Sequence, residues 1–253
     1  MLDMGVNQGA GLHRIALQAA PRVMAVASHG QQQGELPLLW SLCATLVDLG
    51  HSVAVLDATT AESADNPGLA QLLDDAQLQG DENSAPLSWS VIPAAIGLAQ
   101  LCQPMARPGG PLAPLSELFQ RFGVVVIYAQ AGLLADLLPD SGIEPLLTVA
   151  PVKMSAVTAY QALKQMLLNT RLRPTMAAIV GEPALNDAAA SHSPVANLQH
   201  CAMTFLGYRL DALAVRALQP AECRSDDMYR LALRLLENAM PLHRHQYQFM
   251  GSH

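Results

Sequence analysis

The residues with the clearest chemical signature lie between an apolar run, Val23 to Ala27, and a run with helical spacing. This stretch, SHGQQQGEL, has the order of strand, glycine-containing turn and helix in which backbone N–H groups can hold phosphate. The pattern G-x-x-x-x-G-K-[ST] falls here on His29, Gly34, Glu35 and Leu36. The second glycine is present, but the lysine and the hydroxyl are not. We therefore expect HGQQQG to be a solvated turn, with a new ligand for its glutamines as the alternative.

Asp57 ends a second apolar run, SVAVLD. Because it has no lysine, hydroxyl or magnesium partner in the sequence pattern, we interpret it as a solvated carboxylate at a strand end, not a catalytic acid. No catalytic residue is predicted. The four cysteines are scattered without a C-x-x-C pair, which favours buried free thiols in a reducing compartment. The histidines form no i, i+4 pair with an acid, so no metal site is expected.

The composition limits the possible partners. The chain has 253 residues, of which 51% are apolar and only 14% charged, against about 25% charged in ordinary domains. Either the surface exposes apolar area that favours partner contacts, or the core is large and rich in Ala and Leu. A net charge of −7 gives no basic field for nucleic acid. Neither a signal peptide nor a membrane-spanning run is predicted, so we expect a cytoplasmic protein.

Apolar runs and helical periodicities alternate along the chain. Strands are predicted at 22–27, 52–57, 87–93, 123–128, 145–150 and 175–180. Helices are predicted from Pro37, placed in the first turn, to Gly50, and over 68–78 and 155–169, with loops at 107–114 and 182–193. This alternation predicts an α/β fold with a single doubly wound, mostly parallel sheet flanked by helices.

The segment SDDMYRLALRLLENAM predicts an amphipathic helix near the C-terminus. Ser225 can cap it, and Asp226 and Asp227 fall in its first turn. Its apolar face consists of Met228, Leu231, Leu235 and Leu236. The acidic start and the few basic residues favour packing of this face against the core, with contact to a membrane surface as the alternative.

Five segments, in the same order, resemble the MinD/ParA family of deviant P-loop ATPases, and within it the flagellar-number regulators FlhG, also called FleN. NQGAGLHR resembles the D-Q-A-x-G-L-R-R motif of that branch, and PRVMAVAS resembles P-R-V-I-A-V-T-S. LGHSVAVLDA, FGVVVIYAQAG and PVKMSAVTAYQALK resemble L-G-x-x-V-L-L-L-D-A-D, Y-D-x-x-x-x-D-T-x-A-G and P-E-P-T-S-I-T-D-A-Y-A-L-I-K. The resemblance covers nearly the whole chain and implies a P-loop NTPase-like domain over residues 21–253.

The same resemblance marks where this chain departs from the family's nucleotide pocket. The family loop S-G-K-G-G-V-G-K-T-T aligns with Ser28 to Pro37, so Gly30 and Glu35 stand where the family has lysines, and Leu36 stands where it has the magnesium-binding hydroxyl. Thr59 and Tyr128 stand in place of two acids. The altered or retained pocket positions are Ser28, Gly30, Gly34, Glu35, Leu36, Asp57, Thr59 and Tyr128.

The reversal of charge at Glu35 works against a triphosphate. At about 4 Å and an effective dielectric near 20, one pair of unit charges is worth roughly 4 kcal/mol. A carboxylate replaces that attraction by repulsion, although the loop amides could still attract an anion. We therefore expect weak or absent binding of ATP and magnesium, no hydrolysis and no cofactor.

By resemblance, the protein is expected to be a regulatory pseudo-ATPase that acts by protein–protein binding in flagellar assembly, number or placement. The family's N-terminal, glutamine-containing segment stimulates an SRP-type GTPase, so residues 1–20 are expected to bind such a partner through Gln8, Leu12 and Arg14. A peripheral position at the inner membrane stays open. The alternatives are an active or partner-completed ATPase and a scaffold in cellulose or pilus assembly.

Overall fold

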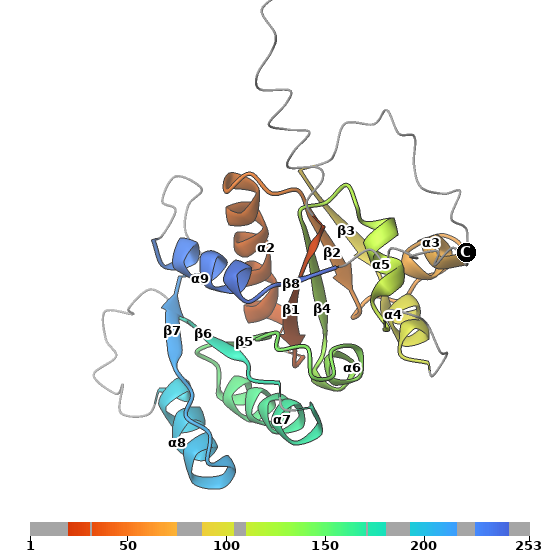
Figure 1. The fold of residues 1–253 in the computed structure, drawn as a ribbon. Helices are drawn as coiled ribbons and strands as arrows, with labels where there is room; N and C mark the ends of the chain where they lie inside the picture. The colour runs from red at the N-terminus through yellow and green to blue at the C-terminus, as the bar shows by residue number, and fades with distance from the viewer. Residues whose placement is uncertain are drawn as a thin grey trace, which may run out of the picture.

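The computed structural model describes residues 20–30, 32–74, 88–103, 110–170, 172–180, 193–216 and 226–242. Strands and helices alternate along these ranges, as the sequence predicts (Figure 1). The expected partner-binding residues Gln8, Leu12 and Arg14 lie outside the described residues, as do positions 182–192 of the predicted loop and the expected cap Ser225.

Within the described residues, eight strands form one sheet. Their bounds are β1 Arg22–Ser28, β2 Val53–Asp57, β3 Trp89–Pro93, β4 Val124–Gln130, β5 Leu146–Val149, β6 Thr175–Ile179, β7 Ala212–Val215 and β8 Met240–Pro241. Seven of them pair in parallel in the order β3-β2-β4-β1-β5-β6-β7, and β8 runs antiparallel to β1. The expected single, mostly parallel sheet is therefore confirmed.

The central strands are buried on both faces. β4 pairs with β1 on one side and β2 on the other, and its first six residues are buried. A strand covered on both faces needs no polar alternation, which is why GVVVIY forms a continuous apolar run. Of the residues of β1, only Val26 and Ala27 pair with β5. β8 pairs with Arg22 and Val23 at the other end of the same edge of β1.

Helices cover both faces of the sheet. Their bounds are α2 Gln32–Asp48, α3 Leu69–Asp74, α4 Ala95–Leu101, α5 Ala113–Leu118, α6 Ala131–Leu137, α7 Lys153–Thr170, α8 Pro194–Leu206 and α9 Asp226–Glu237. α2 and α9 lie side by side over one core, and the other helices contribute to the second core on the opposite face (Figure 1). None of the described helices is long and apolar enough to cross a membrane.

The predicted amphipathic helix is α9, and its apolar face packs against the core. Met228, Leu231, Leu235 and Leu236 are all buried in the same cluster as α2. The interpretation of this face as a core-packing surface is confirmed.

Two predicted boundaries are wrong. α2 begins at Gln32, so Pro37 lies inside the helix and not at its start. Gly30 turns the chain with a φ of 87°, and the helix begins directly after this turn. The glutamines at its start are good helix formers, so they add a turn before Pro37. Pro37 still has no N–H to donate within the helix. The predicted loop at 107–114 ends earlier than expected, because α5 starts at Ala113 with a proline in its first turn.

Candidate functional site

The candidate residues meet at the carboxyl edge of the sheet. The register aligns Val26 of β1 with Tyr128 of β4, and Tyr128 with Asp57 of β2. Ser28 ends β1 at this same edge, immediately before the loop that leads to α2. Ligands of open α/β sheets bind outside the carboxyl ends of the strands, so the fold brings these residues to the expected place.

Gly34 lets the first turn of α2 approach the end of β5. A Cβ added at Gly34 would lie 2.7 Å from the Cβ of Ala150, closer than real Cβ atoms come to other atoms. Gly30, by contrast, has open space around it and is needed for its positive φ. The two glycines therefore serve different purposes: one turns the chain and the other permits close packing.

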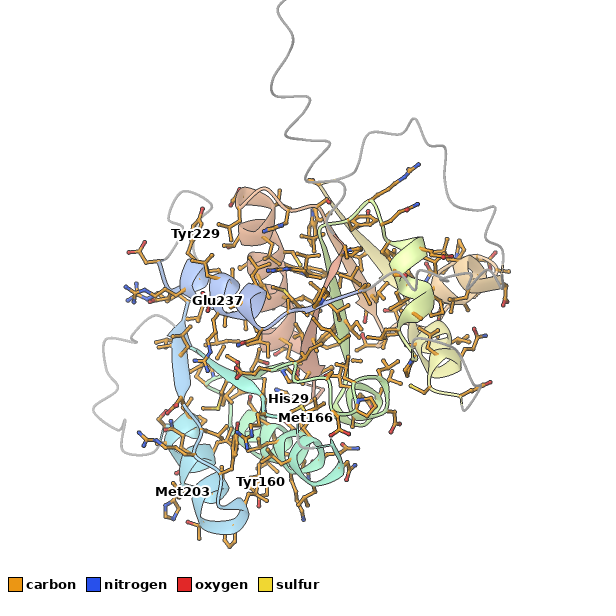
Figure 2. All side chains as sticks on the ribbon, in the orientation of Figure 1. His29, Tyr160, Met166, Met203, Tyr229 and Glu237 are labelled. Atoms are coloured by element: carbon orange, nitrogen blue, oxygen red, sulfur yellow. The ribbon has the colours of Figure 1, made fainter. Side chains whose placement is uncertain are left out.

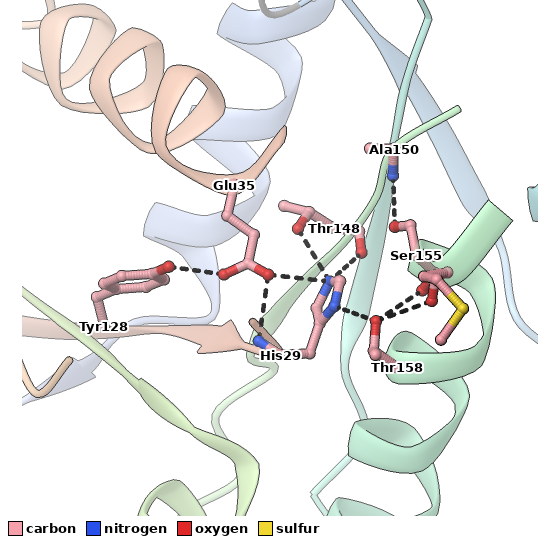
Figure 3. A network of polar contacts seen from close by, with 8 residues as sticks. His29, Glu35, Tyr128, Thr148, Ala150, Ser155 and Thr158 are labelled. Carbon is pink, nitrogen blue, oxygen red and sulfur yellow. Dashed lines mark hydrogen bonds and ion pairs between the residues drawn. The ribbon is translucent and has the colours of Figure 1, made fainter. Parts of the chain in front are cut away.

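Glu35 points from α2 back to the loop, and its carboxylate is buried (Figure 3). The backbone N–H of His29 donates to Oε1 at 3.2 Å, and the hydroxyl of Tyr128 donates to Oε2 at 2.6 Å. A loop N–H that could serve a bound anion thus bonds to a carboxylate of the chain itself. Two residues that depart from the resembled family, Glu35 and Tyr128, bind each other.

Tyr128 is fully buried, and its surroundings keep its hydroxyl protonated. Burial raises the pKa of Tyr128 far above its usual range, and the hydrogen bond to Glu35 raises it further. The side chain of Ser28 lowers the pKa through a hydrogen bond, whereas the charges of Glu35 and Asp57 add to the increase. Tyr128 is therefore a hydrogen-bond donor to Glu35 at any physiological pH.

His29 connects this carboxylate to the other side of the loop. Its Nε2 lies 2.8 Å from the carbonyl oxygen of Thr148 and 3.4 Å from Glu35 Oε1. Because a carbonyl oxygen can only accept, Nε2 carries a proton. Nδ1 lies 2.8 Å from the hydroxyl of Thr158, so the ring bridges the loop, β5 and α7, the helix that also carries Tyr160 (Figures 2 and 3).

The expectation of a simple solvated turn is wrong at His29. Its side chain is only 2% exposed and is bonded through both ring nitrogens. Gln32 and Gln33 are exposed, but they belong to the first turn of α2. The loop pattern includes His29 but does not predict these two partners, because they come from β5 and α7, more than 100 positions away.

Asp57 and Thr59 form a local turn. Asp57 Oδ1 accepts the N–H and the hydroxyl of Thr59 at 2.8 and 2.6 Å, and Oδ2 accepts the hydroxyl of Thr60 at 2.8 Å. The carboxylate is thus not simply solvated, because three donors of the following residues bind it. This local bonding is the behaviour expected of an aspartate that begins an Asx turn.

Leu36 makes the position after Glu35 apolar, since its side chain packs against the core under α2. No hydroxyl is available there to hold magnesium. Among the residues that the structure describes, no group of three or more His, Cys, Asp or Glu side chains could hold a metal ion.

A second buried carboxylate, Glu62, was not predicted from the sequence. It accepts the backbone N–H groups of Ala70 at 3.3 Å, Ile96 at 2.7 Å and Gly97 at 2.8 Å. Burial acts to raise the pKa of Glu62, but the backbone hydrogen bonds outweigh it and lower the pKa below its usual value. Glu62 therefore joins the first turns of α3 and α4, and two of its partners are more than 30 positions away in sequence.

Three solved structures share this fold over most of their length. A chain of the MinC:MinD cell division protein complex of Aquifex aeolicus has a TM-score of 0.57 and 12% identity, covering 88% of this chain and 98% of that one. The MinD cell division protein of Aquifex aeolicus has a TM-score of 0.53 and 13% identity, covering 87% and 99%. A plasmid partition protein of Borrelia burgdorferi has a TM-score of 0.52 and 12% identity, covering 86% and 97%.

No protein-family model and no curated protein matches the sequence. At identities this low, the structural similarity establishes the fold alone. The order of the strands, the helices on both faces and the three structural matches together identify this chain as having a MinD/ParA-type, P-loop NTPase-like fold.

Proposed function

We propose that this protein is a regulatory pseudo-ATPase of the MinD/FlhG type, which acts by binding other proteins and not by turning over ATP. The observation that carries the proposal is the position of Glu35. Its buried carboxylate lies at the loop between β1 and α2 and accepts hydrogen bonds from the loop backbone and from Tyr128.

The energetic argument rests on charge and on the hydrogen bonds already formed. A phosphate beside Glu35 would be repelled by roughly 4 kcal/mol per pair of charges at about 4 Å and an effective dielectric near 20. Moving Glu35 out of the way would break its bonds to His29 and Tyr128, each worth about 1.5 to 3 kcal/mol when one partner is charged. Both terms oppose nucleotide entry, and the loop SHGQQQGEL contains no lysine that could compensate for them.

Two observations support the proposal that the protein acts by binding other proteins. The N-terminal segment resembles the family motif that stimulates an SRP-type GTPase, with Gln8, Leu12 and Arg14 at matching positions. One structure with the same fold was solved as a MinC:MinD complex, so this fold can bind a protein partner. We propose a flagellar GTPase of the SRP type as the partner of residues 1–20, with control of flagellar assembly, number or placement as the outcome.

Calorimetric titration with ATP and ADP, with and without magnesium, tests the loss of nucleotide binding. We expect no heat of binding from protein that is folded by circular dichroism. Micromolar binding would contradict the proposal and favour an ATPase that a partner or a second copy completes.

A Glu35→Lys variant is expected to gain no hydrolysis, because Leu36, Thr59 and Tyr128 still lack the magnesium-binding and acidic groups.

Deletion of residues 1–20 tests whether this segment binds the SRP-type GTPase. The truncated chain should keep its fold and lose its affinity for the SRP-type GTPase, whereas equal affinity of both chains would exclude this segment as the binding site.

Deletion of the gene should change flagellar number or swimming. A change in cellulose matrix or pili instead would identify the scaffold alternative.

A further inference from the structure

His29 of the loop between β1 and α2 is held by two elements, and only one of its two contacts fixes a proton. Its Nε2 lies 2.8 Å from the carbonyl oxygen of Thr148 on β5, and its Nδ1 lies 2.8 Å from Oγ1 of Thr158 on α7. A carbonyl oxygen only accepts, so the proton on Nε2 is fixed. A hydroxyl both donates and accepts, so the contact at Nδ1 suits a bare nitrogen or an N–H equally well.

The hydroxyl of Thr158 has a second place for its proton. Oγ1 lies 3.1 Å from the carbonyl oxygen of Met154 and 3.3 Å from that of Ser155, both in the first turn of α7. When Thr158 donates to one of these carbonyls, Oγ1 is left to accept an N–H from Nδ1 of His29. When it donates to Nδ1, the ring is neutral. The same heavy-atom positions therefore serve a neutral ring and a doubly protonated, positive ring (Figure 3).

Glu35 faces the ring and supplies the opposite charge. Its Oε1 lies 3.4 Å from Nε2 of His29, and the two side chains are only 1% and 2% exposed. A buried carboxylate is costly unless it is paired, so the positive form of the ring gains attraction to Glu35. Burial of the ring acts in the other direction and favours its neutral form. The charge on Glu35 therefore helps to decide whether the ring holds its second proton.

The surroundings of His29 contain few other titratable groups. Within the described residues they are Glu35 on α2, Tyr128 on β4, which donates to Glu35, and Asp57 on β2, whose charge acts on Tyr128. Burial and the hydrogen bond to Glu35 raise the pKa of Tyr128 far above its usual range, so its hydroxyl stays protonated. β5 and α7 present hydroxyl and carbonyl groups to the ring. Histidine is the side-chain type that titrates between about pH 5 and 8, so His29 is the group of this network suited to sense pH.

We propose that His29 is a pH-sensitive switch that links the loop to the first turn of α7. At lower pH the ring is positive, faces Glu35 and donates to Thr158, whose hydroxyl then donates to the helix. At higher pH the ring is neutral and Thr158 donates to it instead. The second proton is exchanged with the solvent, so no other reactant is needed. Met154 is 58% exposed, so the state of the switch reaches the surface at the start of α7.

The switch is independent of the proposed loss of ATPase activity, because it uses only hydrogen bonds within this chain. It concerns the two sides of the loop and does not require that nucleotide is bound or excluded. A failure of the titrations below would leave the proposed function untouched, and binding of ATP would leave the switch untouched.

Nuclear magnetic resonance of the full chain with nitrogen-15-labelled histidine tests the switch, because the ring nitrogen shifts distinguish an N–H from a bare nitrogen. The His29 signals are those that disappear in His29→Gln. We expect Nε2 to stay protonated between about pH 5 and 8, and Nδ1 to lose its proton within that range. The backbone signals of Met154 and Ser155 should change with the same midpoint. A ring that keeps one form throughout, or helix signals that do not follow it, would overturn the proposal.

Glu35→Gln tests the opposite charge. We expect the midpoint of the His29 titration to move to lower pH by at least about half a unit, because a nearby opposite charge favours the charged form. His200 is the internal control, since it is exposed on α8 and its midpoint should stay where it is. No movement at His29, or an equal movement at His200, would contradict the role of Glu35.

Thr158→Val tests the hydroxyl and leaves the charged pair in place, so it decides the question even if Glu35→Gln does not fold. The positive ring then lacks the acceptor of its Nδ1 proton, and the midpoint should again fall. The signals of Met154 and Ser155 should no longer follow the ring. Thr158→Ser keeps the hydroxyl and should behave like the unaltered chain. Equal titrations of the Val and Ser variants, in protein that is folded by circular dichroism, would overturn the switch.

Discussion

Glu35 and Tyr128 are 93 positions apart in sequence and form one buried hydrogen bond. Considered singly, each is an unfavourable choice: a buried carboxylate needs donors, and a buried tyrosine hydroxyl needs an acceptor. Considered together, with the backbone N–H of His29, they satisfy each other. The chemistry at the loop is therefore a property of the pair, and substitutions at one position should depend on the other.

Tyr128→Phe removes the donor and leaves Oε2 of the buried carboxylate without it. We expect the free energy of unfolding to fall by about 1.5 to 3 kcal/mol, the usual contribution of a hydrogen bond to a charged group. Urea unfolding monitored by circular dichroism measures this change. Tyr160→Phe is the control, because Tyr160 lies on α7 and packs against the core on the other face of the sheet from Tyr128.

A double-mutant cycle with Glu35→Gln isolates the pair. If the tyrosine acts through the carboxylate, Tyr128→Phe should cost less in the Glu35→Gln background, with a coupling of about 0.5 to 3 kcal/mol. Strictly additive losses would mean that the two side chains stabilise the fold independently, and the interpretation of the loop as occupied by its own carboxylate would lose its energetic basis.

At the scale of elements, Gly34 sets how closely α2 approaches the end of β5. Alanine in a helix is normally favoured over glycine by about 1 kcal/mol. Here the added Cβ would meet the Cβ of Ala150 at 2.7 Å. We expect Gly34→Ala to lower the free energy of unfolding by about 1 to 3 kcal/mol, as overpacked sites do, in a thermal or urea unfolding experiment.

Removal of the opposing methyl group provides the control for Gly34. In an Ala150→Gly background, Gly34→Ala should become neutral or stabilising, because the helical preference for alanine then acts without the clash. A gain in stability in the single Gly34→Ala variant would show that α2 can move away from β5 at little cost.

Glu62 joins α3 and α4 through backbone N–H groups, and its contribution should depend on pH. Its pKa in the folded state is lowered, so the stabilisation is present above its unfolded pKa of about 4.3 and is lost as the pH falls through the folded value. At pH 7, Glu62→Gln should cost about 1 to 3 kcal/mol. The difference from the unaltered chain should shrink in unfolding experiments below about pH 4.

Glu117 provides the comparison for Glu62, because it is an exposed acid on α5. Glu117→Gln should change the free energy of unfolding by less than about 0.5 kcal/mol at any of these pH values. A Glu62 variant that behaved like the Glu117 variant would mean that the two helices keep their positions without the carboxylate.

The elements were predictable where local sequence decides them. β1, β2 and β4 are continuous apolar runs because both their faces are buried, and the apolar face of α9 follows directly from its period. Pro37 did not predict the start of α2, because the helix already begins at Gln32, directly after the turn at Gly30. The candidate pocket positions were predicted from the resemblance to the MinD/ParA family. The partners of Glu35 and Glu62 were not, since only the assembled sheet brings them together.

At the scale of the whole molecule, charge is divided unevenly along the chain. Residues 23–106 carry nine acids and no lysine or arginine, although the net charge of the whole chain is only −7. The acidic part includes the loop between β1 and α2, Asp57 and the strands β2 and β3. A uniform distribution would give weak and unspecific fields, whereas an uneven one favours partners of the opposite charge.

The described part of the chain begins and ends on the same central strand. β8 pairs with the first residues of β1, and the N–H of Leu242 donates to the carbonyl of Pro21 at 2.8 Å. α9 belongs to the core under α2, whereas Leu242 is buried in the core on the opposite face. The last described residues therefore connect both layers to β1, the strand that leads into the loop.

A chain that ends at Asn238 should be markedly less stable than one that ends at Leu242. The shorter chain loses the burial of Leu242, worth about 1.5 to 3 kcal/mol, and its hydrogen bond to Pro21, worth about 1 kcal/mol. We expect a total loss near 3 kcal/mol in urea unfolding. The chain that ends at Leu242 is the control, since it keeps every contact of β8 described here. If the two truncated chains unfold at the same urea concentration, the pairing of β8 with β1 contributes nothing to the fold, and α9 alone must hold the C-terminal part against the sheet.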